Sequence, residues 1–268
     1  MCGRFTLATT TADELRHRFP LGESVEIEQR FNVAPGDQVV TVGVREGVAT
    51  GRLLRWGLVP PWARDPSIGY RLINARAETV AEKPAFRTSF ARRRCLIVAD
   101  GFYEWQREVV TTPVAPGGRR RGRASSLKQP FHITREDGAP FAFAGLWTGW
   151  KDPAIEDEDA AWLRTCTIVT TEANEKIHGI HPRMPVMLEA ADEEVWLDPE
   201  STPERLRALL HPLPPAETHF RPVSRAVNNA RYDGPDCLAD PAPEDLKAFA
   251  EAVNAAHAAP TGEQDGLF

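Results

Sequence analysis

Short apolar runs, each closed by residues that favour turns, recur along the chain and limit it to short strands. The run CLIVA (95–99) is continuous, as in a strand buried on both faces, and it ends at Asp100-Gly101. The runs PFHITRED and PFAFAGLWTGW (130–150) are joined across Asp137-Gly138, which predicts a hairpin. Residues 30–44 are predicted as a loop and a Pro-Gly turn followed by an alternating strand, and further strand-like runs lie in 48–62 and 165–174. We therefore predict a mostly antiparallel, barrel-like β core.

Helical patterns are few and lie beside this core, which gives an α+β fold with a few peripheral helices. They cover 10–19, 190–211 and 243–257. Residues 109–130 are rich in Gly, Pro, Ser and Arg and predict a mobile loop, and the last residues are expected to be disordered. Because no linker separates two cores, we expect one domain with a loosely attached tail.

Composition favours a soluble, cytoplasmic protein. Of the 268 residues, 42% are hydrophobic and 26% charged, and no apolar run approaches the ~20 residues of a membrane span. No signal peptide is apparent at the N-terminus. The four cysteines, Cys2, Cys95, Cys166 and Cys237, are scattered without a CxxC pair, so neither a zinc site nor a disulfide framework is predicted. Cys95 and Cys166 have apolar neighbours and are expected in the core.

Charge is divided unevenly along the chain. Residues 1–150 hold 22 Lys and Arg against 15 Asp and Glu, a balance of +7, whereas residues 151–268 hold 10 against 23, a balance of −13. The basic half includes RTSFARRR (87–94) and RRRGR (119–123). Such asymmetry allows a basic face on an acidic protein. For RRRGR alone, a solvated loop is the simpler interpretation.

Cys2 has chemistry that its position makes available. Initiator methionine is commonly removed when the next side chain is small, and removal of Met1 would leave a free α-amine and a thiol on one residue. A cysteine at a chain end rarely packs, because termini fray. The start MCGRF therefore raises the hypothesis of an N-terminal nucleophile.

Three polar segments lie at the ends of apolar runs and carry candidate site residues. INARAE alternates Asn74, Arg76 and Glu78, which share one face of an extended chain. GFYEW sets Glu104 among aromatics, where desolvation would raise its pKa and suit it to proton transfer.

The third segment, IHPRMP, holds His181 and Arg183, a group that titrates near neutrality and a bidentate phosphate ligand. Each of these residues alone is more often structural or solvated than catalytic. The residue pattern alone does not bring the three segments together.

Seven motifs in order give the chain a specific resemblance. They are MCGRF, RFNVAPGD, WGLVPPWA, INARAET, ADGFYEW, IHPRMPVML and PVSRAVNN. Together they resemble the SRAP family, the SOS response-associated peptidases, which includes the abasic-site shielding proteins of bacteria and humans. The resemblance covers residues 1–237 and implies a single SRAP-like domain, with 238–268 as a partly helical and then disordered extension. Departures at 107–130, 152–161 and the C-terminus touch no motif.

The resemblance implies a protein that binds single-stranded DNA and captures abasic sites covalently through its N-terminal cysteine, as a Schiff base that becomes a thiazolidine. The implied catalytic residues are Cys2, Asn74, Glu104 and His181. The implied DNA-binding residues are Gly3, Arg4, Pro35, Trp62, Arg76 and Arg183. The arginines suit phosphates, while the proline and tryptophan suit base stacking or a wedge.

No cofactor, metal or membrane is implied. A monomer is expected, in the cytoplasm and at the nucleoid when it acts on DNA.

Three other functions remain open at this level. A class II glutamine amidotransferase also begins with Cys-Gly, but the substrate-binding segment and synthase domain of that class are not found. A thiol peptidase could use Cys2, Glu104 and His181, with removal of Met1 as its simplest activity. A non-catalytic single-strand-binding module would leave Cys2 without a role.

Overall fold

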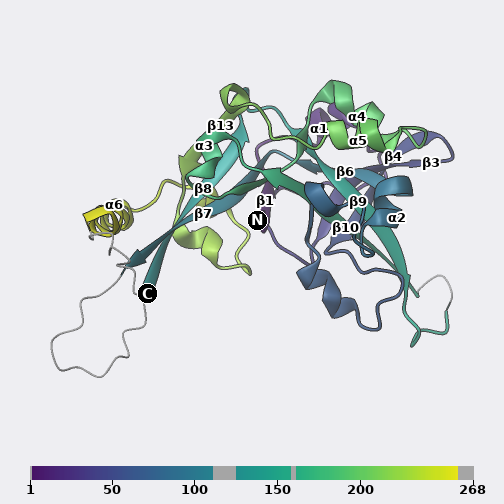
Figure 1. Ribbon diagram of the computed structural model, residues 1–268, viewed down its shortest axis with the longest axis horizontal. Coiled ribbons are helices and arrows are strands. Elements are labelled where there is room, and N and C mark those ends of the chain that lie inside the picture. Colours follow the sequence, from purple (N-terminus) through teal and green to yellow (C-terminus); the bar gives the residue numbers. More distant parts are fainter. Residues whose placement is uncertain (1, 111–124, 158–160, 259–268) are drawn as a thin grey trace, which may run out of the picture.

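The computed structural model describes residues 2–110, 125–157 and 161–258 (Figure 1). Its strands are β1 (Arg4–Leu7), β2 (Arg30–Val33), β3 (Gln38–Arg45), β4 (Val48–Trp56), β5 (Asn74–Arg76), β6 (Arg94–Ala99), β7 (Gly101–Val110), β8 (Ser125–Arg135), β9 (Phe141–Lys151), β10 (Trp162–Glu172), β11 (Arg183–Pro185), β12 (Met187–Leu188) and β13 (Thr218–Pro222).

The α-helices are α1 (Ala12–Arg18), α2 (Arg87–Arg92), α3 (Glu175–His178), α4 (Ala190–Leu197), α5 (Pro203–Ala208) and α6 (Pro243–Ala258). The 3-10 helices are η1 (Pro66–Arg71), η2 (Ala77–Thr79), η3 (Pro215–Glu217), η4 (Arg225–Asn228) and η5 (Pro235–Leu238).

Five strands close into a barrel, in the order β4-β3-β6-β9-β10 and back to β4. The pairs within the ring are antiparallel except β10 with β4, which is parallel. The predicted α+β class with a mostly antiparallel, barrel-like core is therefore confirmed. After β4 the chain makes the excursion 57–73 and returns as β5, which also pairs with β10 in parallel.

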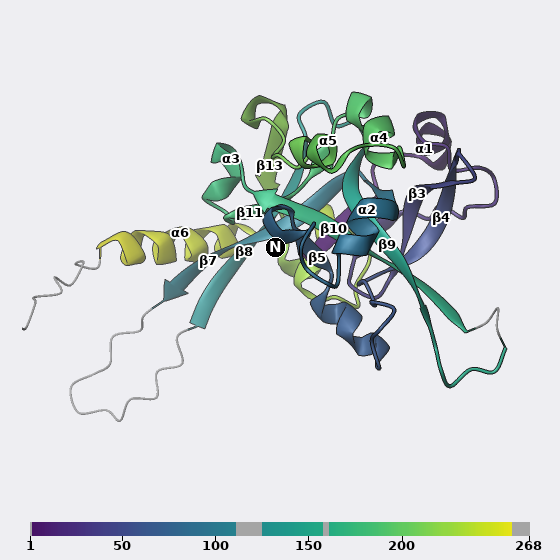
Figure 2. The same cartoon turned by 45° about the vertical axis from the view of Figure 1, so that its right-hand side comes forward.

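A second sheet, in the order β13-β8-β7-β1-β2, lies beside the barrel (Figure 2). Its strand β1 pairs with β2 on one edge and with β7 on the other, with Arg4 opposite Tyr103. The start of β1 lies near the junction of the barrel and this second sheet (Figure 1). This sheet therefore sets Cys2 beside the middle of β7.

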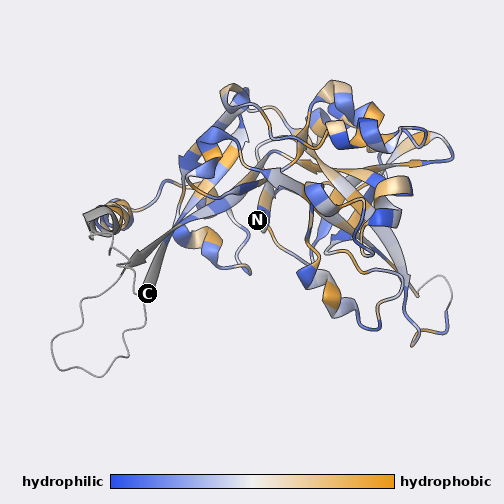
Figure 3. Ribbon diagram, viewed as in Figure 1, coloured by the Kyte–Doolittle hydropathy of each residue, from blue (hydrophilic) through white to orange (hydrophobic). Residues whose placement is uncertain are grey.

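The barrel wall is apolar on both faces, which explains the unbroken run CLIVA. Alternate residues of β6 join two separate clusters: Leu96 and Val98 pack with residues of the helices, whereas Cys95 and Ile97 pack with residues of the second sheet. The peripheral helices alternate hydrophilic and hydrophobic residues, as expected for helices packed on one face (Figure 3).

The turn between β6 and β7 ties β1 to β7. The buried carboxylate of Asp100 accepts hydrogen bonds from the Thr6 hydroxyl and from the backbone N–H of Ala8, both at 2.6 Å. A side chain at Gly101 would collide with His132, whose Nε2 lies 3.0 Å from the Thr6 hydroxyl. The Asp100-Gly101 pair therefore forms the turn between β6 and β7 and also connects this turn to β1.

The three predicted helical patterns all contain helices, whereas α2 and α3 were not predicted. The pattern over 10–19 becomes α1, with Thr11 and Glu14 forming a capping box at its start. The expected helix over 190–211 is two helices, because Pro203 lacks the N–H that a continuous helix requires and instead begins α5. The 243–257 pattern forms α6.

The predicted mobile loop at 109–130 lies partly outside the described residues, as do RRRGR and the tail after 258. Strands β7 and β8 extend into this loop as far as the pair Val110–Ser125. The domain boundary at 237 stays a prediction. No helix among the described residues has the length and apolar character needed to cross a membrane.

Candidate active site

Cys2 is fully buried at the start of β1. The Nδ2 group of Asn74 donates a hydrogen bond of 2.7 Å to the Cys2 carbonyl oxygen, and the Cys2 thiol lies 3.8 Å from the Arg4 carbonyl. Asn74 begins β5, opposite Ile168 of β10. The parallel pairing with β10 thus brings the INARAE motif to the N-terminus, across 72 residues of sequence.

The surroundings of Cys2 keep its thiol neutral. Burial raises the pKa of this thiol, and the negative charge of Glu104 raises it further. A thiolate, the usual attacking form of cysteine, is therefore scarce at neutral pH. Chemistry that begins at the Cys2 nitrogen does not need one.

Glu104 and His181 face each other beside Cys2. The Glu104 side chain, on β7, is almost completely buried, and its Oε1 lies 4.0 Å from Nδ1 of His181. Both the backbone N–H and the carbonyl oxygen of Arg183 lie 3.0 Å from that Nδ1. The four predicted catalytic residues, Cys2, Asn74, Glu104 and His181, thus form one connected cluster.

The end of β10 explains how distant motifs meet. One of its edges pairs with β5, with Arg76 opposite Thr170, and β11 pairs with Arg183 opposite Glu172. Asn74, the first residue of β5, and His181, two residues before β11, are therefore carried to the same end of the barrel.

Arg183 is engaged within the protein. Its guanidinium donates two hydrogen bonds to the carboxylate of Glu78, at 2.6 and 3.0 Å, and one of 2.6 Å to the Thr170 carbonyl. The ion pair holds the pKa of Glu78 below its usual range. Arg76 is exposed on β5, and its charge also stabilises ionised Glu78. Of these two expected phosphate ligands, Arg76 is the more accessible.

Arg4 is half-buried and also bound internally. One of its nitrogens donates to the Asn32 side-chain oxygen and to the Val227 carbonyl, both at 2.9 Å. The amide of Asn32 in turn donates to the Asn229 and Tyr232 carbonyls, at 3.0 and 2.7 Å. The motifs RFNVAPGD and PVSRAVNN therefore meet around Arg4. Asn32 was not singled out from the sequence, although it lies in a recognised motif.

The remaining predicted DNA-binding residues border the cluster or lie on the surface. Gly3 and Pro35 are half-buried, whereas the side chain of Trp62 is 60% exposed. Trp62 lies in the excursion between β4 and β5, which is joined to the barrel by the hydrogen bond from Trp150 to the Ala63 carbonyl.

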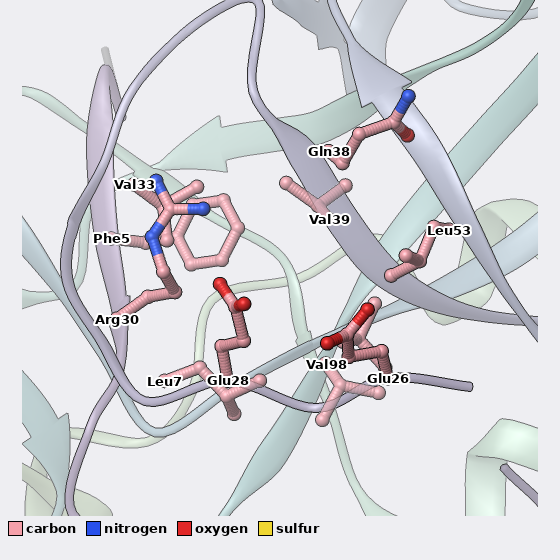
Figure 4. Close-up of a pocket in the computed structure, with 11 residues that line it drawn as sticks. Phe5, Leu7, Glu26, Glu28, Arg30, Val33, Gln38, Val39, Leu53 and Val98 are labelled. Carbon is pink, nitrogen blue, oxygen red and sulfur yellow. The ribbon is translucent and has the colours of Figure 1, made fainter. Parts of the chain in front are cut away.

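A cavity of about 150 Å³ lies apart from this cluster (Figure 4). Phe5, Val33 and Val39 give it an apolar lining, and Glu28 and Arg30 are among its polar residues. Arg30 is already paired with Asp37 and Asp233. None of the four clustered residues lines this cavity. The described residues also hold no group of three or more metal-ligating side chains suited to a metal ion.

Comparisons with known proteins identify relatives of this chain. A family model described as SOS response associated peptidase (SRAP) matches residues 1–230. The abasic site processing protein YoqW of Bacillus subtilis (strain 168) is 39% identical over 244 residues, covering 89% of this chain and 99% of that protein. The abasic site processing protein HMCES of Xenopus tropicalis is 29% identical over 285 residues, covering 89% and 78%.

Solved structures share the fold. A protein from Bacteroides thetaiotaomicron superposes with a TM-score of 0.70 at 21% identity, over 90% of this chain and 99% of that one. A phage-related protein from Bordetella bronchiseptica gives a TM-score of 0.61 at 28% identity, over 88% and 100%.

Proposed function

This chain belongs to the SOS response-associated peptidase family, and we propose that it binds single-stranded DNA and captures abasic sites covalently through Cys2. The single observation that carries the proposal is the cluster around Cys2. Asn74 donates a hydrogen bond to the Cys2 carbonyl, Glu104 is close enough to raise the pKa of the Cys2 thiol, and His181 lies beside Glu104. The names of the family relatives supply the substrate class.

The reaction begins once Met1 is removed. The free α-amine, with a pKa of ~8 against ~10.4 for lysine, is partly unprotonated at neutral pH. It attacks the aldehyde carbon of the ring-opened sugar, and loss of one water gives an imine. The thiol then adds to the imine carbon: a C–S bond forms, and the thiol proton passes to the nitrogen. This intramolecular step closes a five-membered thiazolidine and needs no oxidant or reductant.

Glu104 and His181 divide the proton transfers. Buried Glu104 is close to Cys2 and serves the attack of the amine and the loss of water. His181, whose Nδ1 lies 4.0 Å from the Glu104 carboxylate, serves opening of the sugar ring. A neutral Cys2 thiol suits this order of reaction steps, because it supplies the proton that the nitrogen takes up when the thiol adds to the imine.

Asn74 has capacity left for a ligand. Its Nδ2 is bonded to the Cys2 carbonyl, while its buried Oδ1 has no hydrogen-bond partner among the described residues. A buried acceptor without a donor is costly. The Cys2 amine or a sugar hydroxyl would satisfy it.

The other functions gain no support from these contacts. A glutamine amidotransferase and a thiol peptidase both attack with the sulfur of Cys2, and its raised pKa disfavours the thiolate. A non-catalytic binding module leaves buried Glu104 and the adjacent His181 without a role.

Cross-linking on denaturing gels tests the proposal. The parent protein should form a heat-stable adduct with abasic single-stranded DNA. Cys2→Ala and Cys2→Ser should give an adduct only when borohydride reduces the imine. A tag that retains Met1 should abolish both the heat-stable and the borohydride-dependent adduct. Cys237→Ser should form the same adduct as the parent protein. A heat-stable adduct from Cys2→Ala without borohydride would remove the thiazolidine step.

Time courses separate the two proton carriers. Glu104→Ala should slow adduct formation ~10²-fold or more. His181→Ala should slow capture of a closed abasic sugar more than capture of a pre-opened aldehyde. Identical defects on both substrates in both variants would contradict this division.

A further inference from the structure

Tyr70 is a large aromatic side chain that the fold leaves in solvent. It is 57% exposed and lies in η1, in the same excursion as Trp62. Exposed aromatic side chains of this size are candidates for contact with a ligand.

The Tyr70 ring is held in place by its surroundings. The Arg55 guanidinium lies over the ring, 5.4 Å from its centroid. Gly36, with a φ of 100°, lies against the edge of the ring: a Cβ there would be 3.0 Å from the hydroxyl oxygen. The start of η1 is fixed by Asp65, whose side chain accepts from the Ser67 N–H at 2.7 Å. A pre-positioned ring loses little entropy when it stacks on a ligand.

The same contacts connect Tyr70 to the candidate active site. The Gly36 N–H donates to the Trp56 carbonyl at 2.8 Å, and the Trp56 ring N–H donates to the Ile73 carbonyl, one residue before Asn74. On the other side, Pro35 and Gly36 follow β2, whose Val33 pairs with Phe5 of β1. Tyr70 therefore lies against the turn between β2 and β3, and this turn is hydrogen-bonded to the last residue of β4 before the excursion.

We propose that Tyr70, with Arg55 behind its ring, is a stacking position for one base of the single strand that leads to the captured abasic site. The inference rests on the proposed function. A nucleobase fits better than an apolar protein surface, because the cationic Arg55 lies over the ring, Arg71 follows Tyr70 in the chain and this half of the chain is basic. Arginine on one face of an aromatic ring and a base on the other is a common arrangement in single-strand binding.

The test uses DNA that cannot react, so that binding is measured apart from capture. Single strands carrying a tetrahydrofuran in place of the abasic sugar are labelled with 2-aminopurine, one position at a time on either side of it. Stacking quenches this base. With the parent protein, we expect strong quenching confined to one position.

Variants then assign the quenching. Tyr70→Ala should abolish it and weaken binding at least about fivefold, the lower end of what one base–aromatic stack contributes. Tyr70→Phe should preserve both, because the ring is retained. Trp162→Ala, which removes a 50% exposed aromatic at the start of β10, should behave as the parent.

Unchanged quenching and affinity in Tyr70→Ala would overturn the proposal. The same conclusion follows if Trp162→Ala has an equal effect. Failure of the proposed function would look different: the parent would form no adduct with authentic abasic DNA, while Tyr70-dependent quenching on the unreactive strand would still support the stacking position.

Discussion

Replacing Asp100 should loosen the strand that carries Cys2. This side chain is 2% exposed and accepts backbone hydrogen bonds from Ala8, Thr9 and Thr10, at 2.6, 2.6 and 3.3 Å, besides two hydroxyls. The three N–H groups follow β1, and the carboxylate of Asp100 is the acceptor found for each of them among the described residues. Asp100 thus joins the end of β1 to the start of β7.

The magnitude follows from those donors. Each N–H left without an acceptor costs about 1–3 kcal/mol, and Thr9 and Thr10 are partly accessible to water, so Asp100→Ala should lose about 4 kcal/mol. Asp100→Asn keeps one oxygen but loses the charge, and should lose about 2 kcal/mol. For a chain of this size the alanine variant should unfold about 10 °C lower. Adduct formation should slow in both variants, because β1 is less firmly held.

Urea unfolding followed by tryptophan fluorescence measures these losses. Asp137→Ala is the matched control: this exposed carboxylate caps a turn at the Ala139 N–H, and its removal should cost less than about 1 kcal/mol. If Asp100→Asn and Asp100→Ala are both as stable as Asp137→Ala, the tie between β1 and β7 is energetically unimportant.

Three further predictions concern charge and exposure. Burial lowers the pKa of His132 to about 4, so as the pH falls the unfolded chain is protonated at this residue before the folded protein. The free energy of unfolding should therefore be highest above pH ~6.5 and fall by about 3 kcal/mol towards pH 4. His132→Asn should flatten this pH dependence, as measured by urea unfolding at a series of pH values. Cys95, Cys166 and Cys237 are buried and free, so a thiol reagent should react with none of these three in the native protein and with all of them in denaturant; rapid modification of any of the three in the native protein would contradict their burial. Arg76→Ala should weaken single-strand binding and reduce the slope of log affinity against log salt concentration by ~0.7. Glu78→Gln, which removes the charge paired with Arg183, should strengthen binding. Equal slopes in Arg76→Ala and the parent would exclude a phosphate contact at Arg76.

Local patterns predicted the elements better than their pairing. The run CLIVA became β6 because both faces of the barrel wall are covered, and Thr11 with Glu14 marked the start of α1. No local pattern indicates that β10 pairs in parallel with β4 and β5, because that pairing depends on how the whole chain returns after its excursion.

The site shows the same division. The residue types at Cys2, Glu104 and His181 suggested chemistry, but the resemblance to a family was needed to associate them. The pair Glu78–Arg183 joins residues 105 apart in sequence, and its geometry withdraws from solvent an arginine expected to bind phosphate. Whether a cation faces a ligand or a neighbouring carboxylate is decided by tertiary packing.

The most direct test of covalent capture through Cys2 is mass spectrometry of the heat-stable adduct with abasic single-stranded DNA, followed by peptide mapping. The account predicts the mass of the protein without Met1 plus that of the DNA, less one water, with the DNA on the peptide that begins at Cys2. DNA attached to any other peptide, or to protein that retains Met1, would contradict it.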